Sequence, residues 1–364
     1  MIRKPTLVLN EDRCRKNITA MAAKAKRSGL QLRPHFKTHQ SLEIGRWFKE
    51  EGIEKITVSS LEMARYFSEE WDDITVAFPV NVLEYATINE LADKINLNLL
   101  VESLDSLTHL NRLLTGDINL YIKINIGNNR TGIDPKDHSL ITRIVEEIVS
   151  SKHLIFAGFL GHAGQTYSCR SKIEIVETHA KAIGIMTSLR DVFKKDFPNL
   201  KISYGDTPSS SVCDDFAGID ELRPGNFVFY DLMQEQIGAC NSEQIAVALA
   251  CPVVAIHSAR NEIIVYGGGI HLSKDSMHDR EGRIFGRLIE TNDQAWGEII
   301  PNCFVKTLSQ EHGIISVSDS LLKRIKIGDL IYILPVHSCM TANLMKEYLT
   351  TTGRKIEMFN PLSA

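Results

Sequence analysis

The sequence predicts an α/β protein, a (β/α)8 barrel followed by a smaller C-terminal antiparallel β domain. In the first part of the chain, apolar runs and amphipathic stretches alternate about eight times, which is the pattern of a closed parallel barrel. From about Gln236 onward the apolar runs become short and β-rich, and Gly, Asn and Asp separate them. The length of 364 residues also exceeds what one ordinary core holds. A doubly wound open sheet is the alternative fold.

The barrel elements can be justified in chain order. After a strand-like segment at 6–9, a helix is expected from Glu11 to Lys26, because Asn10 is a suitable N-cap and Gly29 can close the last turn. The first barrel strand is expected to run into Arg33. The following apolar runs predict strands at 55–59, 74–78, 97–101, 119–125, 154–160, 201–204 and 221–222. The stretches between them predict helices from residues 61, 83 and 103, and over 135–151 and 173–194.

The β-rich part predicts strands at 244–256, 262–265, 304–308, 314–317 and 329–334. The N-terminal strand at 6–9 can pair into the same sheet. We therefore expect a barrel domain over residues 10–235, and a β domain made of residues 1–9 plus 236–364.

Composition excludes several classes of function. A net charge of -4 and a pI near 6.3 leave no basic surface for nucleic acid. No apolar run approaches the roughly 20 residues that span a bilayer, and the first residues form no secretion signal, so no membrane association is expected. Seven cysteines without a repeated spacing argue against a disulfide framework and for a reducing, cytoplasmic location.

Lys37 is the first candidate for chemistry. It lies just after the first predicted barrel strand, and functional residues of such barrels belong at the C-terminal ends of strands. Pro34 and two histidines, His35 and His39, surround it in sequence. A buried, electropositive setting lowers the pKa of a lysine and makes its amine a nucleophile, as a Schiff base with pyridoxal phosphate requires. Taken alone, a solvated loop lysine explains the run as well.

Further polar clusters follow the later strands. Arg130, in a Gly- and Asn-rich turn, can bind an anionic oxygen. Residues 161–167 form a polar loop that can line a ligand, and residues 204–211 offer hydroxyls and backbone N–H groups that suit a phosphate. Residues 223–226 follow the last strand, where barrel phosphate sites are common. Each cluster by itself is also compatible with an ordinary turn, loop or helix cap.

Together these segments resemble the fold-type III pyridoxal phosphate enzymes, in the branch of D-serine dehydratase and D-threonine aldolase. Alanine racemase is a more distant relative with a similar N-terminal domain. The resemblance covers nearly the whole chain and rests on the motifs RPHFKTH (33–39), GNNRTG (127–132), YGDTPS (204–209), RPGN (223–226) and HSC (337–339).

The resemblance implies a role for each matching residue. Lys37 is the catalytic residue that binds pyridoxal phosphate covalently, and Arg130 contacts the phenolic oxygen of the cofactor. The phosphate is assigned to Thr207, Gly225 and Asn226, and the ring walls to Gln165 and Tyr167. Tyr204 corresponds to the group that faces the pyridine nitrogen, although Arg223 lies where racemases place an arginine for that purpose.

His337 and Cys339 are the predicted metal ligands. In an extended segment, residues i and i+2 point the same way, so an imidazole and a thiolate could bind one ion. Alone this spacing is a weak signal, but the family context strengthens it. A thiolate favours zinc, whereas the related aldolases usually carry aspartate at this position, which suits manganese or magnesium.

We therefore expect a lyase that acts on a D-configured β-hydroxy amino acid, as D-serine dehydratase does, to give a 2-oxo acid and ammonia. The alternative is cleavage to glycine and an aldehyde, as in D-threonine aldolase. An amino-acid racemase or a non-catalytic pyridoxal phosphate-binding protein fits less well, because neither uses a metal pair. The resemblance also implies a homodimer with active sites at the interface.

Overall fold

The computed structural model describes residues 2–291 and 296–361. It divides the chain into two compact units, which we describe separately. The barrel unit comprises Thr19–Lys37 and Ile44–Gly225, and the β unit comprises Met1–Ile18, Thr38–Glu43 and Asn226–Ala364. The expected range of 10–235 for a cofactor-binding domain stays a prediction. In the described part of the chain, no helix has both the length and the apolar character needed to cross a bilayer.

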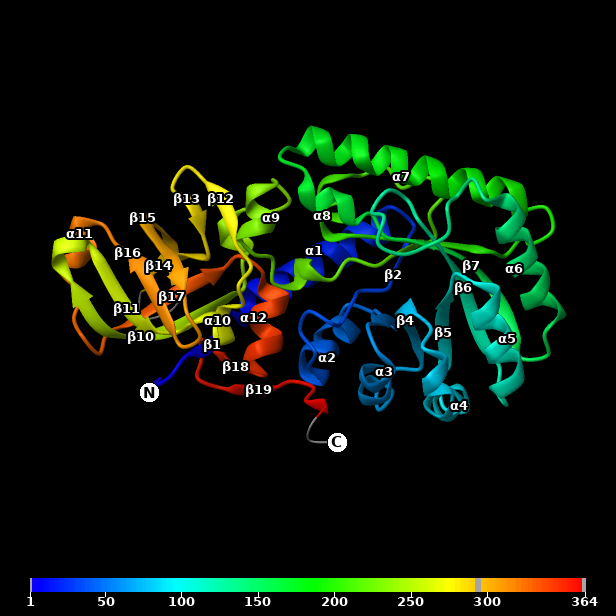
Figure 1. Ribbon diagram of the computed structural model, residues 1–364, viewed down its shortest axis with the longest axis horizontal. Coiled ribbons are helices and arrows are strands. Elements are labelled where there is room, and N and C mark those ends of the chain that lie inside the picture. Colours follow the sequence, from blue (N-terminus) through cyan, green and yellow to red (C-terminus); the bar gives the residue numbers. More distant parts are fainter. Residues whose placement is uncertain (1, 292–295, 362–364) are drawn as a thin grey trace. The chain divides into compact units, whose positions relative to one another are not determined.

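The barrel unit contains a parallel sheet of eight strands among the described residues (Figure 1). Its strands, in their order across the sheet, are β2 (Gln31–Leu32), β9 (Glu221–Leu222), β8 (Lys201–Tyr204), β7 (Leu154–Gly161), β6 (Ile118–Ile124), β5 (Asn96–Val101), β4 (Asp73–Pro79) and β3 (Lys55–Val58). All eight lie within about three residues of the positions predicted from the apolar runs.

The sheet closes on itself between its two terminal strands. His35, just beyond β2, forms a parallel bridge with Thr57 of β3. The backbone N–H of Phe36 donates to Thr57 O at 2.8 Å, and Thr57 N–H donates to Pro34 O at 2.9 Å. Closure confirms the predicted barrel and excludes the doubly wound open sheet.

Amphipathic helices cover the outside of the barrel strands (Figure 1). In α6 the residues at helical spacing, Ile141, Ile144 and Ile148, are all buried. Ser60 and Ser103 are the N-caps of their helices. The side chain of each accepts a hydrogen bond from the backbone N–H of the residue three positions later in the chain. The helices are α3 (Leu61–Phe67), α4 (Tyr85–Ala92), α5 (Leu104–Leu113), α6 (His138–Ser150), α7 (Lys172–Phe193) and α8 (Thr207–Val212), and α1 (Glu11–Arg27) and α2 (Leu42–Glu50) contain residues of both units.

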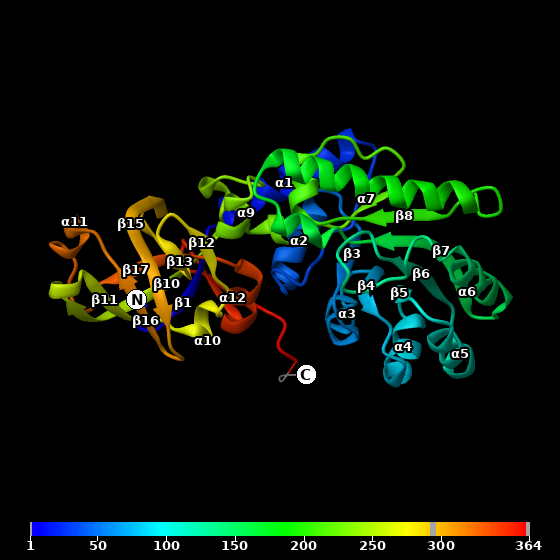
Figure 2. The same ribbon diagram turned by 45° about the horizontal axis from the view of Figure 1, so that its top comes forward.

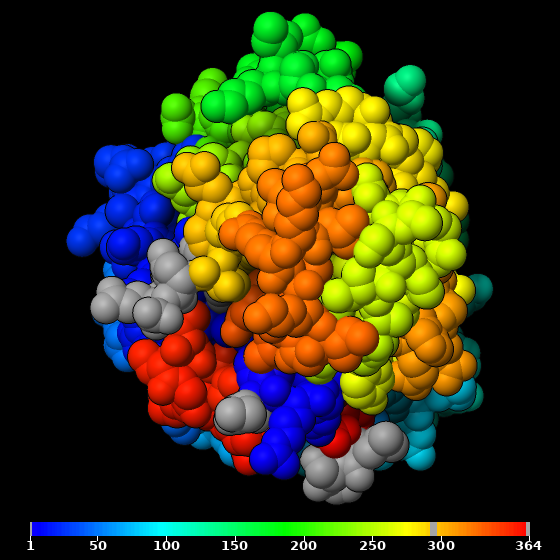
Figure 3. All heavy atoms as spheres, turned by 90° about the vertical axis from the view of Figure 1, so that its left-hand side faces the viewer, coloured from blue at the N-terminus to red at the C-terminus, as the bar shows by residue number. Residues whose placement is uncertain are grey.

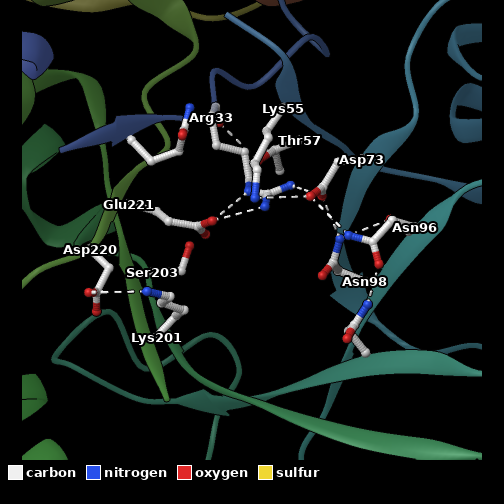
Figure 4. Close-up of polar contacts among 12 residues, drawn as sticks. Arg33, Lys55, Thr57, Asp73, Asn96, Asn98, Lys201, Ser203, Asp220 and Glu221 are labelled. Atoms are coloured by element: carbon white, nitrogen blue, oxygen red, sulfur yellow. Dashed lines mark hydrogen bonds and ion pairs between the residues drawn. The ribbon is translucent and has the colours of Figure 1, made fainter. Parts of the chain in front are cut away.

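An ion network lies at the N-terminal end of the barrel strands (Figure 4). The Arg33 guanidinium donates to Asp73 Oδ1 at 2.6 Å and to Glu221 Oε1 at 2.9 Å, although the Arg33 side chain is only 2% exposed. Lys55 Nζ lies 3.1 Å from Asp73 Oδ2, and the Tyr121 hydroxyl donates to Glu221 Oε2 at 3.2 Å. The two partners of Arg33 are 40 and 188 residues away, so no local pattern could predict this network.

This network predicts that the barrel unit loses stability in acid. Desolvation alone would raise the pKa of both carboxyls, but Arg33 lowers the pKa of Asp73 below 3.8 and that of Glu221 below 4.5. A carboxyl with a depressed pKa stabilises the fold above its unfolded pKa, and this contribution disappears as the pH falls through the folded value. Urea midpoints should therefore fall more steeply below about pH 4.5 in the wild type than in a Glu221→Gln variant. Parallel pH profiles would contradict this expectation.

The β unit is built around a nine-stranded, mostly antiparallel sheet in the described residues (Figure 2). Its strand order is β11 (Glu262–Tyr266), β16 (His312–Ser316), β15 (Trp296–Leu308), β14 (Gly286–Thr291), β17 (Leu330–Pro335), β10 (Val247–His257), β1 (Thr6–Leu9), β18 (Glu347–Thr350) and β19 (Lys355–Glu357). Figure 3 shows the orange surface of β15 and β16 beside the yellow-green surface of β11, as their pairing requires. The N-terminal strand β1 pairs antiparallel with β10, as expected.

Several elements of the β unit were not predicted from the sequence. A short hairpin, β12 (Met277–Asp279) with β13 (Gly282–Ile284), stands apart from the main sheet. The short helices are α9 (Leu232–Gln236), α10 (Gly269–Leu272), α11 (Asp319–Leu322) and α12 (Ser338–Met345). These segments are too short to show a clear period, so pairing and packing at long range decide their conformation.

Candidate active site

Lys37 lies in the turn that follows β2, at the C-terminal end of the barrel strands. The preceding residue, Phe36, anchors this turn, because its buried ring packs against Phe48, Phe67 and Trp71 with centroids 5.0 to 5.1 Å apart. Lys37 is exposed in the structure, and its assignment as the cofactor lysine stays a prediction.

Two histidines near Lys37 are kept neutral. Desolvation, together with the charges of Lys37 and Arg223, lowers the pKa of His35 well below its ordinary value. Desolvation also lowers the pKa of His162 to about 3, against the opposing effect of its hydrogen bond with Gly205. His162 Nδ1 lies 2.7 Å from Gly205 O, which only accepts, so Nδ1 carries the proton. Both rings are therefore uncharged at neutral pH.

Lys123, on β6, is the buried lysine of this end of the barrel. Desolvation and the charges of Arg223 and Arg130 lower its pKa to about 7, and its Nζ donates to Ile124 O at 3.1 Å. Lys123 was not among the residues predicted for the site. A lysine inside the apolar run 120–124 was the signal that could have pointed to it.

Tyr204 and Arg223, the two candidates for the pyridine nitrogen, differ in their contacts. The Tyr204 hydroxyl is buried and lies 3.0 Å from His179 Nδ1 and 3.1 Å from Ser209 Oγ. The Arg223 guanidinium donates to Ser203 Oγ at 2.8 Å and to a backbone carbonyl at 2.5 Å. Its Nη1 group has no partner in the described part of the chain, so Arg223 retains N–H groups that could bind a ligand. The choice between the two stays a prediction.

The residues around α8 fit a phosphate group. The hydroxyls of Thr207 and Ser210 are fully buried and have no hydrogen-bond partner among the described residues. The backbone N–H of Gly225 likewise has no partner in this part of the chain. Buried polar groups are normally satisfied, so three orphaned groups predict an external acceptor or donor. A phosphate oxygen, which accepts several hydrogen bonds, matches this need.

The other predicted cofactor residues line the same barrel unit. Gln165 Nε2 donates to Ile126 O at 2.8 Å, and its Oε1 is buried without a partner in the described residues. The Tyr167 hydroxyl accepts from the backbone N–H of Thr207 at 3.4 Å. Arg130 is exposed, in the turn after β6. All predicted cofactor residues of the barrel unit thus lie at or after the C-terminal ends of its strands.

His337 and Cys339 belong to the β unit. The expectation of an extended segment is only half right. His337 is the extended N-cap of α12 (φ -134°, ψ 98°), whereas Cys339 lies in its first helical turn. Desolvation would lower the pKa of His337, but hydrogen bonds with Asp275 and Cys339 raise it to about 11. The side chains of His337 and Cys339 therefore interact across the N-cap and the first turn of a helix, and not along one face of a strand.

The donor set of this pair fits a divalent metal. An imidazole and a thiol are the usual ligands of zinc. No third His, Cys, Asp or Glu completes a cluster with them within the described ranges. Two protein ligands leave coordination positions open, as a catalytic metal site requires.

Asn226, which the sequence analysis assigned to the phosphate, also belongs to the β unit. Its side-chain Nδ2 lies 2.7 Å from Asp231 Oδ2, 3.0 Å from Ser338 Oγ and 3.5 Å from Cys339 Sγ. The side-chain N–H groups of Asn226 thus donate to acceptors beside His337 and Cys339, and not to a phosphate. The backbone N–H of Asn226 has no partner in the described residues and remains available to a phosphate.

Comparison with known proteins identifies the family. Residues 9–232 match the family model "Alanine racemase, N-terminal domain", and residues 246–351 match "Putative serine dehydratase domain". The chain is 30% identical to the D-serine dehydratase of Dictyostelium discoideum, over 99% of this chain and 96% of that relative. The chain belongs to the alanine racemase-like family, in its D-serine dehydratase branch.

Other members of the D-serine dehydratase branch are similar over the same length. The D-threo-3-hydroxyaspartate dehydratase of Delftia sp. (strain HT23) is 26% identical, over 94% of this chain and 93% of that relative. One solved structure is a cysteine-to-alanine variant of D-threo-3-hydroxyaspartate dehydratase in its metal-free form. It superposes with a TM-score of 0.92 at 23% identity and covers 99% of this chain and 98% of that one. This likeness shows that the branch shares the barrel and the β unit.

Proposed function

We propose that this protein is a pyridoxal phosphate- and metal-dependent lyase that removes water from a D-configured β-hydroxy amino acid, giving a 2-oxo acid and ammonia. The placement of His337 and Cys339 together at the start of α12 carries the proposal, because a metal site with two protein ligands would have open positions for a substrate hydroxyl. The dehydratase names of the relatives from Dictyostelium and Delftia support elimination over other reactions of the family.

Each group has a defined task in this scheme. Bound pyridoxal phosphate withdraws electrons from the substrate α-carbon, and a bound divalent metal is a Lewis acid for the β-hydroxyl. Lys37 would hold the cofactor and, once released, accept the α-proton at Nζ. Thr207, Ser210 and Gly225 would bind the phosphate through their unpartnered O–H and N–H groups.

The metal is proposed to be zinc. Cys339 supplies a soft sulfur ligand and His337 a nitrogen, which is a donor set that zinc binds well. Manganese and magnesium prefer oxygen ligands and are the alternatives. Metal analysis of protein purified without added metal distinguishes them.

The reaction is tested by product identification. With pyridoxal phosphate and zinc, the purified protein should release ammonia and a 2-oxo acid from at least one of D-serine, D-threonine and D-3-hydroxyaspartate, and not from the L-enantiomers. A chelator should lower the rate by about a hundredfold or more, because Lewis-acid stabilisation amounts to several kcal/mol. Added zinc should restore the rate.

Other products would change the assignment. Glycine and an aldehyde would identify an aldolase, and the L-enantiomer of the substrate would identify a racemase. No product from any of the three substrates would contradict the proposal.

We also propose a homodimer whose active sites lie at the interface, as the resemblance implies, and a cytoplasmic location. Light scattering at several concentrations should give twice the mass of one 40.9 kDa chain. A monomer at all concentrations would contradict the dimer.

A further inference from the structure

Both predicted metal ligands have hydrogen-bond partners inside the β unit. On the histidine side, His337 Nδ1 lies 2.8 Å from Asp275 Oδ2. A carboxylate at Nδ1 fixes the ring orientation and leaves Nε2 for an ion. Asp275 comes from the segment between α10 and β12, 62 residues before His337, so no local sequence motif indicates it.

On the cysteine side, two polar groups approach the sulfur. Thr38 Oγ1 lies 3.3 Å from Cys339 Sγ, and Asn226 Nδ2 lies 3.5 Å from the same atom. A metal-bound sulfur is a thiolate, which can only accept hydrogen bonds, so Thr38 and Asn226 must be the donors. Thr38 is fully buried, and its hydroxyl has no second partner among the described residues.

Asp231 fixes the orientation of the Asn226 amide. Its Oδ2 accepts from Asn226 Nδ2 at 2.7 Å and from the backbone N–H of Ser338 at 3.0 Å. Asn226 Nδ2 therefore faces three acceptors, on Asp231, Ser338 and Cys339. An amide turned the other way would bring its oxygen against the carboxylate, so the donor faces the sulfur.

We propose that Thr38 and Asn226 are positioning residues that orient the Cys339 sulfur through hydrogen bonds and thereby strengthen zinc binding at the pair it forms with His337. This inference rests on the proposed function only in requiring that the pair binds a metal. Partners that hydrogen-bond a metal ligand fix its orientation before the ion binds, and their loss typically weakens metal binding.

Thr38 has a second consequence for the enzyme. It directly follows Lys37 in the chain, so the residue next to the proposed cofactor lysine contacts the proposed metal ligand.

The test uses Thr38→Val, which removes the hydroxyl and keeps the shape of the side chain. In metal-depleted protein, competition with a chromophoric chelator should show zinc binding about 10 to 100 times weaker than in the wild type. Thr38→Ser, which restores the hydroxyl, should recover most of the affinity. With Co²⁺ in place of zinc, the sulfur-to-metal charge-transfer band should shift in Thr38→Val, because the thiolate loses a donor.

Thr341→Val is the matched control. Thr341 is also fully buried in the β unit, on the same helix as Cys339, but its hydroxyl contacts only backbone carbonyls, Leu272 O at 3.1 Å and His337 O at 3.3 Å, and not the sulfur. Its zinc affinity and cobalt band should match the wild type. Unchanged binding and an unchanged band in Thr38→Val, or an equal loss in Thr341→Val, would overturn the inference.

The metal readouts separate this inference from the proposed reaction. If His337→Ala and Cys339→Ala bind zinc as well as the wild type, the metal pair itself is wrong, and both proposals fail. If these variants lose zinc but Thr38→Val does not, only the inference about Thr38 fails. If Thr38→Val weakens zinc binding but no substrate turns over, only the proposed reaction fails.

Discussion

Replacing Lys37 with alanine is expected to abolish covalent binding of pyridoxal phosphate and to lower turnover by at least about 10²- to 10⁴-fold, the usual contribution of a positioned base. The same amine is proposed to attach the cofactor and to accept the α-proton, so a single change removes both tasks. The measurements are the visible absorbance of the lysine-bound cofactor and the rate of 2-oxo acid formation.

Lys123 provides the decisive comparison for this prediction. It is the buried lysine of the same barrel end, and its pKa of about 7 would make it a competent nucleophile. Lys123→Met should nevertheless retain the visible absorbance of the bound cofactor. If the absorbance persists in Lys37→Ala and disappears in Lys123→Met, the cofactor lysine is Lys123 and the assignment of Lys37 is wrong.

Arg33→Ala is expected to produce the largest loss of stability, about 3 to 5 kcal/mol in the free energy of unfolding. The positive charge of Arg33 compensates the negative charges of Asp73 and Glu221, whose carboxylates lie in the barrel interior with it (Figure 4). Removing the guanidinium leaves two negative charges close together in a poorly solvated place. Urea unfolding followed by circular dichroism measures the change.

Arg46→Ala is the matched control for Arg33→Ala. Arg46 also pairs closely with a carboxylate, at 2.6 Å from Glu70, but its side chain is 58% exposed. Water solvates both partners there, so the change should barely affect the unfolding curve. Equal effects of the two substitutions would show that burial does not determine the strength of this network.

Local sequence patterns predicted the barrel well. Apolar runs such as 118–124 and amphipathic stretches such as 138–150 contain their own period, and this period decides strand or helix before any long-range contact forms. The β unit was predicted less completely. Its short segments, such as β12 and α12, have no clear period, and their conformation depends on their partners.

The candidate site was also predicted only in part. The chemical groups could be read from the sequence, since Lys37, His337 and Cys339 are residue types with few uses in such motifs. Their local conformation could not be read in full. Cys339 lies in the first turn of α12 where an extended segment was expected, because packing with distant residues decides where this helix begins.

The sequence by itself therefore determined the barrel, the order of its strands and the identity of the reactive groups, because these properties depend on neighbouring residues. Only the tertiary structure decided which groups meet. Thr38 contacts Cys339 across 301 residues, and Arg33 pairs with Glu221 across 188. Such contacts form only when the whole fold brings distant segments together, so no local pattern encodes them.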